Sequence, residues 1–128
     1  MTNQLQGEIL YKGWSGSTSV DWAYTPWMPV RGDLAVYAVE VLAITGGLTL
    51  TWEVETRVGE DPQTPTIVSV TPTQSTTLVG VATVLGNSAA VSDYAKQWVR
   101  YKFHTGSGAT LTDYVIFRAL QPSWQVNR

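Results

Sequence analysis

Apolar and polar residues alternate along several short segments of this chain, in the pattern of strands that bury one face. In residues 48–56 the apolar positions are 48, 50, 52 and 54, and the positions between them are threonine or glutamate. This period of two predicts a half-buried antiparallel strand. We expect Trp52 and Val54 in the core, and Glu53 and Glu55 on the opposite, solvated face.

Turn-forming residues separate eight strand candidates along the chain. They span residues 7–14, 19–27, 34–44, 48–58, 66–70, 76–85, 97–104 and 114–120. Gly46 and Gly47 stand between two of the candidates and indicate a hairpin. Many short strands with frequent turns predict an all-β fold, an antiparallel β-sandwich or jelly-roll of about eight strands. With no long internal linker, the chain is expected to form a single β-sandwich domain over residues 1–128.

The last two candidates carry matching apolar faces. Residues 99, 101 and 103 are apolar and alternate with the basic residues 100, 102 and 104, and residues 115, 117 and 119 form the apolar face of the final candidate. The segment 105–110 between them has the glycine, serine and threonine content of a loop. We therefore expect these two strands to meet across a hairpin.

Neither end of the chain continues the alternating pattern. Residues 1–6 have no periodic apolar pattern, and residues 121–128 include a proline break at Pro122 and then Trp124 and Val126. Because tryptophan is costly to leave in water, we expect 1–6 and 121–128 to be flexible or docking arms that contact other molecules. The alternative is that Trp124 folds back onto its own domain.

Composition favours a strand-rich protein with little surface charge. The chain has 17 threonines and 16 valines among 128 residues, and these residue types suit a pleated surface. Charged residues make up 14 % of the chain, against roughly 25 % in ordinary soluble domains. A surface short of charge can be covered by a partner protein. A net charge of −2 gives no basic field that would attract nucleic acid or an anionic membrane.

Residues that carry catalysis or bind metals are scarce. There is no cysteine, and His104 is the single histidine, without a motif of a nucleophile or metal site around it. Glu53 and Glu55 have the spacing of a glycosidase pair, but a solvated strand face explains them more simply. Glu60 and Asp61 are two adjacent acids, whereas a calcium loop needs several oxygen ligands at alternating positions. We expect no catalytic residue, no metal site and no bound cofactor.

Two further features bear on where the protein acts. Arg31, Gly32 and Asp33 spell the tripeptide that integrins recognise, but they precede a strand where a turn is needed, and a turn is the simpler interpretation. No signal peptide is visible at the start, and the longest apolar stretch is too short to span a bilayer. The lack of cysteine fits synthesis in a reducing cytoplasm.

The tryptophans outside the core candidate leave two kinds of binding open. Trp14, Trp22, Trp27 and Trp124 lie near strand ends or loops. Exposed aromatic residues stack on sugars, and they also anchor protein interfaces. We name Trp14, Trp27, Trp124 and Val126 as interface candidates, and a glycan is the alternative ligand.

A small, cysteine-free β-protein that is rich in threonine, valine and tryptophan, with no signal peptide and with arm-like ends, resembles the decoration, cement and other accessory proteins of tailed-phage virions. The resemblance covers the whole chain and includes no specific motif. It implies a non-enzymatic virion structural protein, made in the host cytoplasm, that decorates or cements a phage capsid or tail. Its partners would be copies of itself and a major capsid or other virion protein. The alternative is a carbohydrate-binding β-sandwich module that uses exposed tryptophans.

Overall fold

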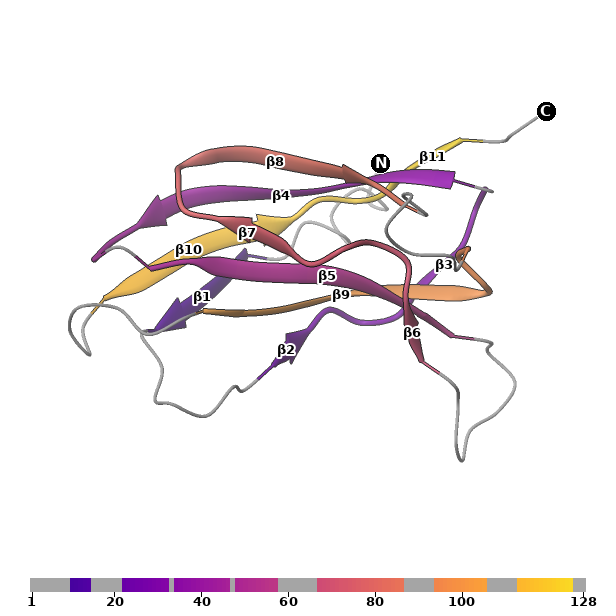
Figure 1. Cartoon of the computed structure of the whole chain (residues 1–128), viewed down its shortest axis with the longest axis horizontal. Helices are drawn as coiled ribbons and strands as arrows, with labels where there is room; N and C mark the ends of the chain where they lie inside the picture. Colours follow the sequence, from indigo (N-terminus) through magenta and orange to yellow (C-terminus); the bar gives the residue numbers. More distant parts are fainter. Residues whose placement is uncertain are drawn as a thin grey trace.

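Eleven strands in two antiparallel sheets make up the part of the chain that the computed structural model describes, residues 10–14, 22–32, 34–46, 48–57, 67–86, 94–105 and 113–125 (Figure 1). Sheet A contains β1 (Leu10–Trp14), β4 (Leu34–Ile44), β8 (Gly80–Leu85), β10 (Tyr114–Ala119) and β11 (Ser123–Gln125). Sheet B contains β2 (Ala23–Tyr24), β3 (Met28–Pro29), β5 (Leu50–Arg57), β6 (Val68–Ser69), β7 (Gln74–Thr76) and β9 (Trp98–Thr105). These ranges contain no helix, and so none that could cross a membrane.

Three pairs of short strands are each one strand with an interruption. β2 and β3 lie along the same edge of β9, β6 and β7 along the same edge of β5, and β10 and β11 along the same edge of β4. Sheet A then has the order β1, β10–β11, β4, β8, and sheet B the order β2–β3, β9, β5, β6–β7. This is the strand order of a jelly roll, so the expected antiparallel sandwich is confirmed.

Inward-facing side chains of both sheets form one core. Its largest members are Tyr37, Val39, Val41, Val115 and Phe117 from sheet A and Leu50, Trp52, Val54, Val99, Tyr101 and Phe103 from sheet B. Trp52 and Val54 are fully buried, as their alternation with glutamates predicts. Glu53 and Glu55 lie on the other face of β5, as expected, where they meet basic side chains of β9. The expected solvation of Glu55 is wrong, because its ion pairs with Arg100 and Lys102 leave it buried.

Two connections that were expected to be hairpins instead join the two sheets. β4 and β5 belong to different sheets, so the turn between them carries the chain across the sandwich. Gly46 in this turn has a φ of 63°, and the Asp113 side chain fills the space that a Cβ atom would need, which favours glycine. β9 and β10 also lie in different sheets, and their apolar faces meet across the core, where the ring centroids of Phe103 and Phe117 are 4.7 Å apart. Alternation identifies the inward side chains but not the sheet that a strand joins.

Each interrupted strand contains a proline, and a buried hydroxyl replaces the missing backbone partner. Proline has no N–H and cannot continue a ladder; Pro26, Pro72 and Pro122 lie in the three interruptions. Opposite these interruptions, three backbone N–H groups donate hydrogen bonds of 3.0 Å to side-chain hydroxyls. Tyr101 N–H donates to Thr25 Oγ1, Val54 N–H donates to Thr71 Oγ1, and Ala38 N–H donates to Tyr101 Oη. Each of these buried donors therefore has a partner despite the break in the strand beside it.

Tyr101 ties the two sheets together through its hydroxyl. The ring extends from β9 across the core, and the hydroxyl accepts from Ala38 N–H and donates to the Leu120 carbonyl at 2.7 Å. Burial raises the pKa of Tyr101 far above its usual value, because a buried phenolate would lose its hydration. The hydroxyl therefore stays protonated, and it bonds to the backbone of Ala38 and Leu120 at the interruption between β10 and β11.

The described part of the expected C-terminal arm, residues 121–125, lies against its own domain. β11 pairs with the beginning of β4, where Trp124 stands opposite Ala35. The Trp124 ring packs edge-on against Tyr37, with ring centroids 6.1 Å apart. β10 ends before it reaches this part of β4, so an edge is available there for β11 to fill. Trp124 therefore folds back onto its own domain, which was the alternative to an intermolecular contact. Val126 and residues 1–6 lie outside the described residues.

Candidate functional site: an apolar sheet edge

β8 forms one edge of sheet A and exposes a row of uncharged side chains. Its residues alternate, so that Ala82 and Val84 pack against the core while Val81, Thr83 and Leu85 are exposed. Val81 is 58 % exposed and Leu85 is 47 % exposed. Neighbouring exposed aliphatic side chains mark a surface that is suited to contact with another molecule.

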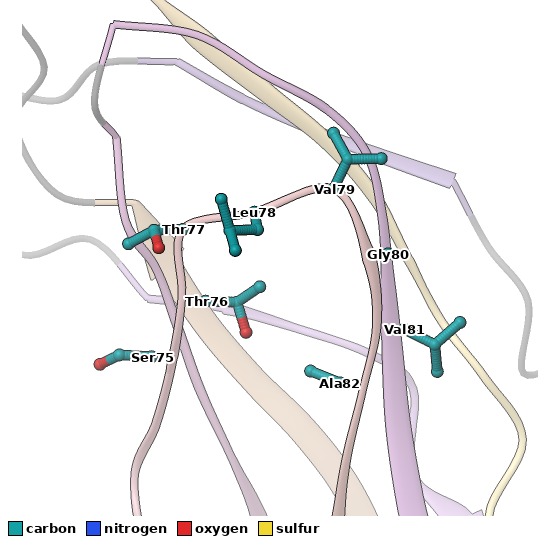
Figure 2. A pocket seen from close by; sticks show the side chains of 8 residues that line it. All are labelled: Ser75, Thr76, Thr77, Leu78, Val79, Gly80, Val81 and Ala82. Carbon is teal, nitrogen blue, oxygen red and sulfur yellow. The ribbon is translucent and has the colours of Figure 1, made fainter.

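The turn that leads into β8 extends this apolar row (Figure 2). Leu78 is 76 % exposed and Val79 is 63 % exposed. Gly80 follows with a φ of 133°, a backbone conformation that favours glycine and turns the chain into β8. A hollow of about 380 Å³ beside this turn is lined by residues 75–82, none of which is charged. The hollow offers contact area rather than acid, base or metal ligands.

Among the residues that the structure describes, the open edge of β8 has none of the usual protections against pairing with another chain. No described strand pairs with the side of β8 that faces away from β4, and residues 80–85 include no charge, no proline and no bulge. Natural edge strands are usually very short, charged or covered. The edge strands of sheet B have two or three residues each, and β1 at the other edge of sheet A includes Lys12. Among the described edges, β8 is therefore the best suited to bind another strand.

The outer face of sheet A next to this edge carries one ion pair in an otherwise apolar row. The residues of β4 beside the exposed β8 row are Val36, Ala38 and Glu40. The Glu40 carboxylate binds Arg118 of β10, whose Nη2 lies 2.6 Å from Glu40 Oε1. Because the two charges neutralise each other, this face presents no net charge beside the edge.

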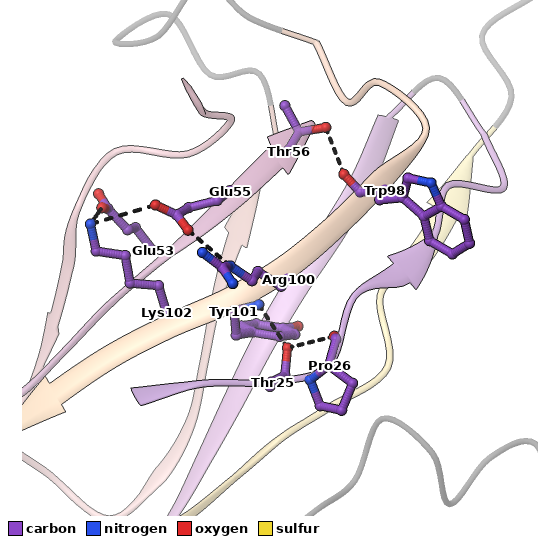
Figure 3. A network of polar contacts seen from close by, with 9 residues as sticks. All are labelled: Thr25, Pro26, Glu53, Glu55, Thr56, Trp98, Arg100, Tyr101 and Lys102. Carbon is purple, nitrogen blue, oxygen red and sulfur yellow. Dashed lines mark hydrogen bonds and ion pairs between the residues drawn. The ribbon is translucent and has the colours of Figure 1, made fainter. Parts of the chain in front are cut away.

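The outer face of sheet B differs in carrying a network of charged residues, which pair with each other (Figure 3). The Arg100 Nε lies 3.0 Å from Glu55 Oε1, and the Lys102 Nζ lies 3.1 Å from Glu53 Oε1 and 3.6 Å from Glu55 Oε2. Partial burial alone would lower the pKa of Lys102, but the hydrogen bond and charge of Glu53 and the charge of Glu55 raise it above its usual value. The two glutamates thus act as ion-pair partners on this face.

Aromatic rings from the segment of β2 and β3 lie over these cations. The Arg100 guanidinium carbon is 3.9 Å from the ring centroid of Tyr24, and the Lys102 Nζ is 4.3 Å from that of Trp22. His104 meets the edge of Trp22, with ring centroids 4.2 Å apart. Cation–π contacts stabilise by about 0.5–1 kcal/mol each at exposed sites and by about 2 kcal/mol when desolvated, and these two cations are largely covered. Apart from Arg57, whose Nε is buried without a hydrogen-bond partner, the rings and charges of this face therefore satisfy one another.

The three interface candidates that the structure describes, Trp14, Trp27 and Trp124, do not come together in one site. Trp14 lies in β1 of sheet A, whereas Trp27 lies on sheet B with its ring centroid 4.3 Å from the guanidinium carbon of Arg100. Trp124 packs against the core, and Val126 is outside the described residues. The strongest candidate surface is β8, which contains none of them.

The other residues that the sequence singled out are also dispersed. Arg31 is exposed and Gly32 approaches the backbone of Gln125, whereas Asp33 and the pair of Glu60 and Asp61 lie outside the described residues. Within the described ranges, no group of three or more histidine, aspartate or glutamate side chains is placed to hold a metal ion.

In the sequence, β8 and the turn before it are marked by an uncharged run. Residues 78–85 include leucine, valine and alanine at six positions and no charge. Alternation alone does not tell whether such a strand lies inside a sheet or at its edge, because that depends on which other strands pair with it.

Comparisons of this chain with protein-family models, with curated proteins and with solved structures found no match.

Proposed function

We propose that this protein is a non-enzymatic structural component of a virion that decorates or cements a phage capsid or tail through contacts with copies of itself and with a shell protein. The observation that carries the proposal is the open, uncharged edge of β8 with its exposed apolar row. Such an edge is a liability in a protein that acts alone, because it pairs readily with other chains. In a structural component the same edge is a binding surface that the assembly covers.

Two features of the whole fold support this proposal. The jelly-roll strand order is common among viral capsid proteins, although lectins and cupins share it, so the fold is supporting analogy only. Four ionisable side chains on the outer face of sheet B, those of Glu53, Glu55, Arg100 and Lys102, pair with each other. Such mutual pairing is typical of a structural ion-pair network rather than of a reactive centre.

The proposal is tested by asking whether the protein resides on particles. Virions from cells that produce the chain would be purified on a density gradient, and the chain would be quantified against the major capsid protein by mass spectrometry. We expect a fixed ratio of the two proteins across the particle peak. The double variant V81K/L85K changes only outward-facing side chains of β8 and is expected to fold normally and to lose this co-migration. A chain that stays in the soluble fractions at every particle density contradicts the proposal.

Glycan binding is the second candidate, and the aromatic row on sheet B is the observation that favours it. Tyr24 is 43 % exposed, and Trp22 and Trp27 flank it on the same segment. Against this candidate, the Arg100 guanidinium already lies over the rings of Tyr24 and Trp27. Binding on a glycan array that Y24A abolishes, with the β8 edge variant unaffected, would favour the glycan over the shell protein.

A further inference from the structure

In β8, every second residue points its backbone N–H and C=O groups toward the open edge of the strand. The Gly86 N–H donates to the Ala35 carbonyl at 2.8 Å, which fixes the hydrogen-bonding phase of the ladder between β8 and β4. In an antiparallel ladder, residues alternate between bonding to one neighbour and bonding to the other side. The residues of β8 whose N–H and C=O groups point away from β4 are therefore Val81, Thr83 and Leu85.

The same three residues expose their side chains on the outer face of sheet A. Ala82 and Val84, which bond to β4, face inward and pack against the core; Figure 2 shows Ala82 and Val81 on opposite sides of the strand. One set of residues thus supplies both the backbone groups and the side chains of the open edge.

We propose that the occupant of this edge is a second copy of the chain, whose β8 pairs antiparallel with the first across a two-fold axis beside Thr83. In this register Thr83 stands opposite Thr83 of the partner subunit, and Val81 stands opposite the partner's Leu85. All N–H and C=O groups that point to the edge are then bonded, since each such pair exchanges two hydrogen bonds.

Other registers use the edge less completely. A shift by one residue turns the bonding groups of one strand away from those of the other. A shift by two residues in either direction pairs only two of the three edge residues within β8 and moves the third beyond the end of the partner strand. The register centred on Thr83 is the one that pairs every edge residue within the strand.

The side chains across this axis are compatible with a copy of the same chain. Threonine opposite threonine and valine opposite leucine are favourable cross-strand pairs. The charged residue nearest to the edge in the described sheet is Glu40, beside Val81, and it is already paired with Arg118. The axis places the Glu40 residues of the two copies at opposite ends of the ladder, so like charges do not meet. An isologous contact of this kind closes on itself and does not propagate into fibres.

The inference deepens the proposed function, and it depends on that function only in taking the β8 edge as a protein-binding surface. Pairing would join the two copies of sheet A into one continuous sheet, on which the exposed apolar rows become neighbours. A strand pair of this length buries less than a typical stable interface. The dimer should therefore dissociate at high dilution, and covalent trapping is the suitable assay.

The absence of cysteine from the chain makes the register testable one residue at a time. The variants V81C, T83C, L85C and the control T73C, which places a thiol at an exposed position of sheet B, would each be oxidised under the same conditions. Hydrogen-bonded antiparallel partners have Cα atoms about 5.5 Å apart, within the range of a disulfide. Residue 81 in the two copies would be separated by about 13 Å, which is too far.

We expect T83C to form covalent dimers at least tenfold faster than T73C and than V81C or L85C alone. A mixture of V81C and L85C should form heterodimers faster than either variant alone. A T83C rate equal to that of T73C would overturn the dimer, and self-crosslinking of V81C as fast as T83C would overturn the register. If T83C fails to dimerise while the chain still co-migrates with particles, the inference is wrong and the proposed function stands. Rapid T83C dimerisation without particle association supports the dimer and contradicts the proposed function.

Discussion

At the scale of single residues, three buried hydroxyls make the prolines in the sheets tolerable. Each hydroxyl accepts from a backbone N–H that faces a proline-containing interruption, and each bond measures 3.0 Å. A buried N–H without a partner costs about 1–3 kcal/mol. The side chains of Thr25, Thr71 and Tyr101 are therefore important for the stability of the fold.

The substitution T71V tests this role. Valine keeps the shape of threonine but cannot accept the hydrogen bond from Val54 N–H, so we expect the free energy of unfolding in urea to fall by about 1–3 kcal/mol. The matched control is T73V, because the Thr73 hydroxyl donates to Glu53 at an exposed position and its loss should change stability by less than about 0.5 kcal/mol. Equal effects of the two substitutions would show that the buried hydroxyl contributes nothing special.

Three raised pKa values predict a loss of stability at alkaline pH. Burial raises the pKa values of Tyr37 and Tyr101 above their usual 10.0. Burial acts to lower the pKa of Lys102, but its glutamate partners raise it above the usual 10.5. Each group therefore holds its proton more tightly in the folded protein than in the unfolded chain. The stabilisation is fully present below pH 10.0 and is lost as the pH rises toward the raised values.

Urea denaturation at pH values on both sides of 10.0 measures this effect. We expect the free energy of unfolding to fall with rising pH above that value. In Y101F the protein should be less stable at neutral pH, because Ala38 N–H loses its acceptor. Its alkaline decline should also be shallower than that of the parent. Parallel declines in both proteins would exclude Tyr101 as a contributor.

At the scale of elements, the alternating pattern predicted where strands lie better than how they pair. The candidate at residues 34–44 has the same bounds as β4 (Leu34–Ile44), because an uninterrupted apolar face identifies a strand without knowledge of its neighbours. The candidate at residues 76–85 is divided between β7 and β8, which belong to different sheets. β3 and β11 were not predicted, since two or three residues next to a proline contain too little pattern.

The candidate site was less predictable than the fold, for a physical reason. Tryptophans stand out in a sequence, but Trp124 is drawn into the core and Trp27 stacks on a cation. The β8 edge is defined by the absence of a neighbouring strand, and this absence follows from contacts between residues far apart in the chain. No local pattern encodes it.

A pair of lysine substitutions tests the assignment of inner and outer faces in β8. V81K places a charge on an outward position, so we expect the free energy of unfolding to change by about 0.5 kcal/mol or less. A82K places the same charge on the neighbouring inward position, where burial of an unpaired ammonium should cost more than about 2 kcal/mol or prevent folding. Urea denaturation of both variants measures the difference. If V81K is the more damaging substitution, the face assignment is wrong.

At the scale of the whole molecule, the two outer faces of the sandwich suit different surroundings. The four charges of Glu53, Glu55, Arg100 and Lys102 on sheet B are paired within the chain, and the two cations lie under its own aromatic rings. Sheet A presents an apolar row beside an open strand edge. We therefore expect the molecule to dock through sheet A and to turn sheet B outward.

The central claim is that another protein chain covers the open edge of β8 in the assembled state. Residue-resolved amide hydrogen exchange tests it most directly. In dilute protein, the amides of Ala82 and Val84 should exchange slowly because they bond to β4, and those of Val81, Thr83 and Leu85 should exchange rapidly. In the assembled protein, on the particle or at high concentration, we predict that all five amides exchange slowly. Rapid exchange of Val81, Thr83 and Leu85 in both states would contradict the account.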